Sequence, residues 1–283
     1  MAHKNKTNIS PYKTRRFQQS TNPKDATAAA AEVGALKSNH HGKHKKPTSI
    51  FSIEEANDRL YDLFRNHDFA DVSHTTRKIF AQFYVLLMKT QEKENFTRLV
   101  SIKDVGIRHF IDCMMVPRLT ELQFPLMDLG TGPGFPGIPL KILFPKEPIF
   151  LAEGVQRRVE FLKTVREELH LENLPIIGRN INPFFAYPMQ SVITRAVEDV
   201  GNTLKNVSTC LQTGGRVYFM KGPNVQPELE ALTPELQEHY VLEKNIYYTL
   251  PKTPHERRLL VFKLIKPFPL PDFDDEFPDF TKS

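Results

Sequence analysis

Between residues 51 and 117, apolar positions recur at the spacing of amphipathic helices. Ser52 and Glu55 form a capping-box pattern at the start of the first helix, in which the serine hydroxyl accepts a backbone N–H of the first turn. Further helices are predicted over residues 73–89 and about 104–115, and the last is expected to end at Pro117 because proline interrupts the hydrogen-bond ladder of a helix. These segments predict an all-helical cap.

After residue 120, short apolar runs alternate with helical segments. Strands are predicted over residues 124–127, 149–152, 175–178, 191–194, 216–220, 240–250 and 257–265. Helices are predicted between them over residues 134–144, 156–169 and 199–211. Alternation of this kind indicates a parallel sheet, and the two long strands at the end indicate an antiparallel edge. The predicted fold class is therefore α/β, with a mostly parallel seven-stranded, Rossmann-like sheet.

The first predicted strand runs into a glycine-rich loop, DLGTGPGFPG, at residues 128–137. Gly130, Gly132 and Gly134 allow a sharp turn and a close approach of a ligand to backbone N–H groups at the start of the next helix. The GxGxxG spacing within the loop is also found in dinucleotide sites, so it leaves the ligand open. Asp128 adds a carboxylate before the first glycine, which favours a ligand with a positive charge or an amino group. S-adenosylmethionine is such a ligand.

Charged residues stand at the ends of several later strands. Glu153 closes the second strand, where an acid can accept hydrogen bonds from both ribose hydroxyls of an adenosine. Arg179, Arg195 and Lys221 each end a predicted strand, and together they would form a positive rim for phosphates. Arg257 opens the last strand and either joins this rim or caps the strand. The sequence therefore predicts a nucleotide-binding edge with basic surroundings.

Other catalytic chemistries have no anchor in the sequence. It contains no HExxH motif, no Ser–His–Asp arrangement and no cluster with metal-ligand spacing. Cys113 and Cys210 lie far apart and are interpreted as buried thiols in a reducing compartment. His109, on the last predicted helix of the cap, is interpreted as a structural histidine. No apolar run approaches the roughly 18 residues of a membrane span, so we expect a cytoplasmic protein that binds neither membrane nor metal.

Charge is concentrated at the two ends of the chain. Residues 1–50 hold ten basic and two acidic residues, a net charge of +8, and residues 267–283 carry −4, which leaves +1 for residues 51–266. The polar first segment is predicted to be disordered, and it acts as a solvated tail, an RNA-attracting arm or a transit peptide. The expected domain order is this extension, a helical cap over 51–120, an α/β domain over 121–266 and an acidic, Phe- and Pro-rich tail.

Several segments together resemble a known family, the bacterial small-subunit rRNA guanine-N7 methyltransferases, also called glucose-inhibited division protein B. The resemblance covers about residues 50–266 and lies in segments that follow one another in the family's order. These are NFT (95–97), RHFID (108–112), DLGTGPGFPGIPL (128–140), RRVEFLKTVREELHLEN (157–173), TRA (194–196), MKG (220–222) and HERRLLVFK (255–263).

The resemblance implies a class I methyltransferase fold, S-adenosylmethionine as donor and guanine N7 of 16S rRNA, in the small ribosomal subunit, as acceptor. It adds Phe135, Asn180, Ile181 and Arg195 to the cofactor-binding residues Asp128, Gly130, Gly132, Gly134 and Glu153. It implies that Arg179, Lys221 and Arg257 position the RNA or the guanine. Guanine N7 has a free lone pair and carries no proton, so no general base is expected, and alignment of the reactants can supply the catalysis. The protein is expected to act as a monomer.

Two other functions remain open at this point. An NAD-dependent oxidoreductase would use the same GxGxxG pattern, although no hydride-transfer pair follows it in the sequence. A degenerate methyltransferase fold would act as a ribosome-assembly or RNA-binding factor without catalysis. Binding of S-adenosylhomocysteine in preference to NADH would distinguish a methyltransferase from the oxidoreductase. Substitution of Asp128 would distinguish it from the non-catalytic factor, which should keep its function.

Overall fold

The computed structural model describes residues 44–195 and 197–269. In this part of the chain, seven strands form one sheet in the order β3-β2-β1-β4-β5-β7-β6. The strands are β1 (Leu126–Leu129), β2 (Ile149–Ala152), β3 (Ile176–Ile177), β4 (Met189–Arg195), β5 (Leu211–Lys221), β6 (Tyr240–Thr249) and β7 (Glu256–Leu264). The first five strands are parallel, and β7 pairs antiparallel with both β5 and β6. The predicted mostly parallel sheet with an antiparallel edge is confirmed.

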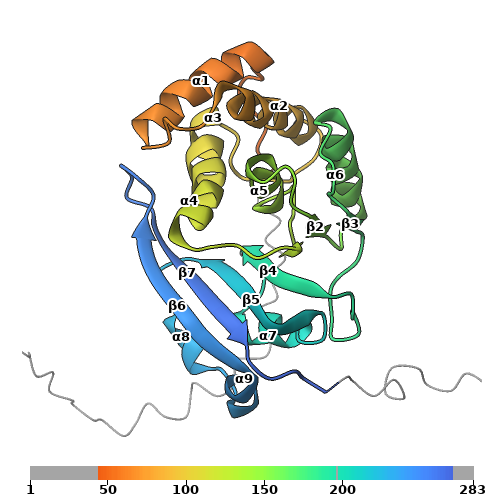
Figure 1. Cartoon of the computed structure of the whole chain (residues 1–283). Helices are drawn as coiled ribbons and strands as arrows, with labels where there is room; N and C mark the ends of the chain where they lie inside the picture. The colour runs from red at the N-terminus through yellow and green to blue at the C-terminus, as the bar shows by residue number, and fades with distance from the viewer. Residues whose placement is uncertain (1–43, 196, 270–283) are drawn as a thin grey trace, which may run out of the picture. The chain divides into compact units, whose positions relative to one another are not determined.

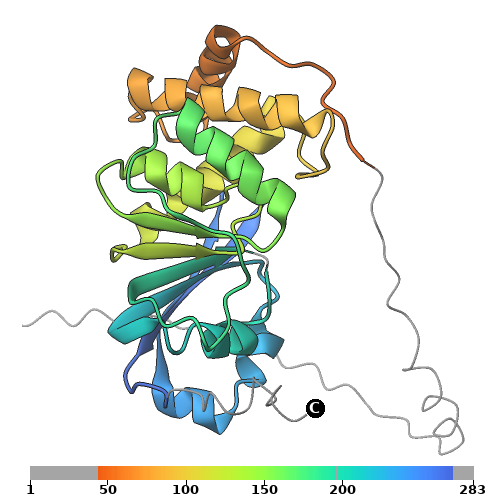
Figure 2. The same cartoon turned by 90° about the vertical axis from the view of Figure 1, so that its right-hand side faces the viewer.

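Helices cover both faces of this sheet (Figures 1 and 2). One face carries α1 (Ile53–Asn66), α2 (His74–Gln91), α3 (Ile102–Val105), the π-helical segment η1 (Gly106–Ile111), α4 (Asp112–Leu119), α5 (Gly137–Leu143) and α6 (Gln156–Glu168). Figure 2 shows the short helices α7 (Val200–Asn206), α8 (Gln226–Glu230) and α9 (Pro234–His239) on the opposite face. Loops follow the carboxyl ends of the parallel strands, at the edge of the sheet between its two faces.

Alternating side chains of the strands build one core on each face. In β5, Tyr218 belongs to the core under the first group of helices, and its neighbour Phe219 belongs to the core under α7–α9, as the two-residue period of a strand requires. The helical cap shares the first of these cores. Phe83 of α2 lies with its ring centroid 5.2 Å from that of Phe135 in the glycine loop. The cap is therefore packed directly onto the loop that the sequence marks as functional.

The helix before β1 is longer than predicted. α4 passes through Pro117 and ends at Leu119, because proline lacks only its own N–H and the Thr120 N–H still donates to the Val116 carbonyl at 3.0 Å. The predicted helix over residues 199–211 was also too long. It ends at Asn206, and Leu211 pairs with Met189 of β4 instead, since pairing within the sheet outweighs helical propensity. The end of α4 was thus misplaced by a local signal, whereas the end of α7 depends on pairing with a distant strand.

The described residues include no helix long and apolar enough to cross a membrane. The predicted basic extension lies outside the described residues as far as Lys43, and the acidic tail lies outside them from Leu270 onward. The expected domain boundary near residue 120 falls between α4 and β1, and the division into domains stays a prediction.

Candidate functional site

The glycine-rich loop turns through a backbone conformation that side chains rarely adopt. Gly130, Gly132 and Gly134 have φ angles of +65°, +60° and +105°. A Cβ atom on Gly130 would lie 2.5 Å from Cγ2 of Val197, whereas a Cβ atom on Gly132 would point into open space. Both positions need glycine for the turn, and Gly130 also needs it for the close approach of the loop that follows β4.

Asp128 lies beneath this loop. Its side chain is fully buried, and Oδ2 accepts a hydrogen bond from the Gly137 N–H at 2.6 Å. Burial raises the pKa of this carboxyl to about 7, against the lowering effect of hydrogen bonds from Thr131 and Gly137. In the structure, Asp128 therefore contacts the start of α5. Its contact with a cofactor stays a prediction.

Glu153 faces the glycine loop from the end of β2. Its carboxylate is 5% exposed, and Oε2 accepts from the Gly132 N–H at 2.9 Å while Oε1 accepts from the Val155 N–H at 2.8 Å. The guanidinium of Arg158 lies 3.6 Å from Oε1. Each carboxylate oxygen can accept more than one hydrogen bond. The side chain is therefore held in one orientation and keeps capacity for two further donors.

A cleft of about 740 Å³ opens above the loop. Its lining includes the predicted cofactor residues Gly130, Gly132, Phe135, Glu153, Asn180 and Arg195. The structure thus brings together six residues that come from four different segments of the chain. Such a volume is in the range that holds a drug-sized ligand or cofactor.

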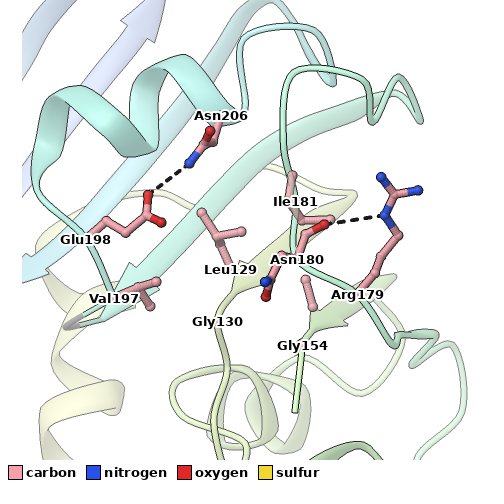
Figure 3. Close-up of a pocket in the computed structure, with 10 residues that line it drawn as sticks. Leu129, Gly130, Gly154, Arg179, Asn180, Ile181, Val197, Glu198 and Asn206 are labelled. Atoms are coloured by element: carbon pink, nitrogen blue, oxygen red, sulfur yellow. Dashed lines mark hydrogen bonds between the residues drawn. The ribbon is translucent and has the colours of Figure 1, made fainter. Parts of the chain in front are cut away.

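A small cavity of about 60 Å³ adjoins this cleft and is drawn in Figure 3. It shares Gly130, Gly154, Asn180 and Val197 with the cleft, and Ile181 lines it from the loop after β3. Arg179 stands at one side of the cavity, and the hydrogen-bonded pair of Glu198 and Asn206 stands at the other (Figure 3). The predicted residue Asn180 therefore lines both the cleft and the small cavity, whereas Ile181 lines the small cavity alone.

A second cleft of about 370 Å³ adjoins the first one on the side of the cap. The residues that line both clefts are Thr97, Arg98, His109 and Arg195. The second cleft is otherwise lined by Leu99, Arg108, Asp112, Met220, Lys221, Gly222 and Arg257. Five of its lining residues are basic and one is acidic, so this cleft suits an anionic ligand.

Asp112 organises the basic groups of the second cleft. Its buried carboxylate lies 3.3 Å from Nε of Arg257 and 3.7 Å from the guanidinium of Arg195, and it accepts from the Tyr248 hydroxyl at 3.4 Å. These contacts join α4 to β4, β6 and β7. One carboxylate thus fixes two arginines that are far apart in the sequence, and leaves the cleft with a net positive charge.

His109 stands between the two clefts. Its ring stacks on Phe135 with a centroid distance of 4.2 Å, and Nδ1 lies 2.8 Å from the guanidinium of Arg195. Burial, with the nearby charges of Arg195 and Arg108, holds the pKa of this imidazole well below its usual value. The histidine is therefore neutral at pH 7, and it lies in the site rather than in a purely structural position.

The predicted positive rim is only partly assembled. Arg195, Lys221 and Arg257 meet in the second cleft, whereas Arg179 lines the small cavity beside Asn180. The ammonium of Lys221 is held by the Glu228 carboxylate at 2.8 Å and by the Glu198 carbonyl at 2.6 Å. Roles in positioning RNA or guanine stay predictions for all of these residues.

Sequence reasoning missed several residues of the site. Thr97, Arg98, His109 and Asp112 come from the helical cap, where no strand end marks them. The motifs NFT and RHFID contain three of the four, so the resemblance was the one signal that pointed to this region. No group of three or more metal-ligating side chains occurs among residues 44–195 and 197–269.

Comparison with known proteins connects this geometry to one family. The family model described as rRNA small subunit methyltransferase G matches residues 76–259. A protein of Bdellovibrio bacteriovorus named ribosomal RNA small subunit methyltransferase G 2 is 61% identical over 234 residues, which cover 83% of this chain and 92% of that protein. The ribosomal RNA small subunit methyltransferase G of Carboxydothermus hydrogenoformans is 33% identical over 201 residues, 68% of this chain and 85% of that protein.

Solved structures also align with the chain. An S-adenosylmethionine-dependent O-methyltransferase from Thermotoga maritima aligns with a TM-score of 0.42 and 16% identity, over 66% of this chain and 72% of that one. The family match confirms the resemblance carried by the motifs, and with it the methyltransferase fold predicted from the sequence.

Proposed function

This chain belongs to the rRNA small subunit methyltransferase G family, and from that premise we propose that it transfers a methyl group from S-adenosylmethionine to N7 of a guanine in small-subunit rRNA. The observation that carries the proposal is the pair of adjoining clefts. One is built around a glycine loop and a buried carboxylate, the other is basic, and both share Thr97, Arg98, His109 and Arg195.

The residues of the larger cleft fit the methyl donor. Gly132 leaves open space where any other residue would place a Cβ atom, and the Glu153 carboxylate is fixed at the cleft wall with spare acceptor capacity for ribose hydroxyls. Asn180 of this cleft and Ile181 of the adjoining small cavity offer an amide and an apolar surface for a base. When bound, S-adenosylmethionine supplies an electrophilic methyl group on a sulfonium.

The second cleft fits a guanine within an RNA strand. Arg98 and Arg108 are exposed at its wall and can contact phosphates, whereas Arg195 and Arg257 are held in place by Asp112. Guanine N7 needs no deprotonation, so the work of these residues is to orient the base and exclude water. Alignment of this kind can account for a large rate enhancement without an acid–base pair. We also propose that the protein acts as a cytoplasmic monomer.

The proposal is tested first by cofactor binding. Calorimetry on the full chain should detect S-adenosylhomocysteine and no NADH. Small-subunit rRNA from a strain that lacks the gene is then compared by mass spectrometry with rRNA from the parent strain. One N7-methylguanine should disappear in the deletion strain and return when the gene is restored. Unchanged N7 methylation would refute the proposal.

A further inference from the structure

The Thr97 hydroxyl occupies an unusual position at the boundary between the two clefts. Thr97 is 9% exposed, and it lines both clefts. Its Oγ1 atom accepts the backbone N–H of Leu99 at 3.0 Å and lies 3.2 Å from Nε2 of His109. The direction of that second hydrogen bond decides what Thr97 can offer a ligand.

The contact with Arg195 fixes the direction of the hydrogen bond between His109 and Thr97. A guanidinium can only donate, so Nδ1 of His109, at 2.8 Å, must be the acceptor. The imidazole is neutral because burial and the neighbouring arginines lower its pKa. A neutral imidazole with Nδ1 unprotonated carries its proton on Nε2. Nε2 therefore donates to Thr97, and both lone pairs of the Thr97 oxygen are filled by N–H donors.

The Thr97 proton is left without a partner. Within the part of the chain that the structure describes, no acceptor for this hydroxyl proton is found. With its lone pairs occupied, the hydroxyl can donate a hydrogen bond but cannot accept one. It is thus a neutral group that can only donate a hydrogen bond, and it lies where the cleft above the glycine loop meets the basic cleft.

We propose that the Thr97 hydroxyl, fixed by Arg195 and His109, donates to O6 of the target guanine and so selects guanine over adenine. This inference rests on the proposed function. Next to N7, guanine carries the acceptor O6, whereas adenine carries the donor N6–H₂. A hydroxyl that can also accept would bind either base by rotating, but a donor-only hydroxyl meets adenine with two donors face to face. The same contact leaves N7 free for the transferred methyl group.

The test compares two target bases on each protein variant. Small subunits are assembled on rRNA that carries either guanine or 2-aminopurine, which lacks O6, at the mapped target position. Methyl transfer from labelled S-adenosylmethionine is measured for wild type, Thr97→Val and Thr97→Ser. We expect Thr97→Val to lower the guanine to 2-aminopurine rate ratio about tenfold, the effect of one neutral hydrogen bond. Thr97→Ser, which keeps the hydroxyl, should keep the wild-type ratio.

The guanine to 2-aminopurine rate ratio distinguishes a loss of base recognition from a loss of folded protein. Thr97→Val also leaves His109 and Leu99 without an acceptor, so the variant protein can be less stable, but a loss of folded protein lowers both rates equally and cancels from the ratio. An unchanged ratio in Thr97→Val would overturn the inference. Wild-type protein that binds S-adenosylhomocysteine but methylates no guanine would instead overturn the proposed function itself.

Discussion

The cleft above the glycine loop is shaped by backbone groups, whereas the basic cleft beside it is shaped by charged side chains. In the first, Glu153 is held by the N–H groups of Gly132 and Val155, and Asp128 is held by that of Gly137. In the second, Asp112 holds Arg195 and Arg257 across the interface between cap and sheet. The two carboxylates of the first region and their N–H donors lie within residues 128–155, whereas Asp112 and Arg257 of the second are 145 residues apart.

This difference suits the two ligands. A small cofactor suits a loop held by its own hydrogen bonds, with open space at Gly132 beside the fixed Glu153 carboxylate. An RNA strand is bound by cations, and cations in a half-buried cleft need a counter-charge to keep them in place. Substitutions of residues that line only one cleft should therefore leave the ligand of the other largely unaffected.

The largest effect is expected from Asp112→Ala. The carboxylate side chain is 4% exposed, and its removal leaves two arginine side chains, 17% and 22% exposed, without their counter-charge. We expect a loss of about 3 kcal/mol in the free energy of unfolding in urea, as for other broken buried ion pairs.

Asp71→Ala is the matched control for this measurement. Asp71 also pairs with an arginine, Arg118 at 2.6 Å, but its side chain is 73% exposed. A surface pair contributes at most about 1 kcal/mol. Equal losses for the two variants would show that the Asp112 network does not support the basic cleft.

Glu153→Gln should act on the other cleft. The amide keeps one acceptor oxygen for the Gly132 or Val155 N–H and loses the other, together with the charge. Hydrogen bonds to a charged group contribute about 1.5–3 kcal/mol, so affinity for S-adenosylhomocysteine should fall on the order of tenfold to a hundredfold in calorimetry. Glu160→Gln, on the same side of the sheet with a 55% exposed side chain, should bind like wild type. Wild-type affinity in Glu153→Gln would remove this residue from the cofactor site.

Asp128 predicts a pH dependence of stability. Its pKa is about 7 in the folded chain against an ordinary value near 3.8. Between about pH 4 and pH 7 the folded protein holds a proton that the unfolded chain has released, so this group makes the free energy of unfolding fall as pH rises. The slope is at most about 1.4 kcal/mol per pH unit.

Asp128→Asn isolates this contribution. Asparagine keeps an acceptor for the Gly137 N–H and does not titrate. Urea unfolding of both proteins at pH 5, 6, 7 and 8 should show the wild type losing stability relative to the variant up to about pH 7 and no further above it. Parallel stability curves would contradict a raised pKa.

The smallest effect is expected from Arg98→Ala. Arg98 is exposed at the junction of the clefts and has no ion-pair partner among residues 44–195 and 197–269. Loss of one phosphate contact should weaken RNA binding and reduce the slope of log affinity against log salt by about one. Arg65→Ala, an exposed arginine at the end of α1, should leave the slope unchanged. A slope equal to wild type in Arg98→Ala would place the RNA elsewhere.

The contrast between the clefts also explains what could be predicted from the sequence. The glycine loop, Asp128 and Glu153 are close in sequence and follow strand ends, so a local pattern was enough to find them. The predicted strands and their antiparallel edge were confirmed for the same reason. Asp112 and Thr97 carry no such mark, because their partners lie on β4, β7 and a distant histidine that only packing of the cap brings near.

Arg257 and Arg258 are adjacent, and the sequence alone does not show which of the two reaches the basic cleft. Arg257 meets Asp112 in the basic cleft, whereas Arg258 points to the other face of β7 and is buried against Asn245 and Gln226. The sequence gives two adjacent arginines before an apolar run, and only the register of β7 against β5 decides which one reaches the cleft.

The most direct test of two separate clefts is single-turnover methyl transfer by Arg257→Gln, measured across a titration of S-adenosylmethionine with small subunits as acceptor. One titration yields both the half-saturating donor concentration and the rate at saturation. We predict that the half-saturating concentration stays within about twofold of wild type while the saturated rate falls about tenfold or more, a loss of at least about 1.4 kcal/mol in the transition state. A weakened donor half-saturation with an unchanged saturated rate would contradict the assignment of the two clefts.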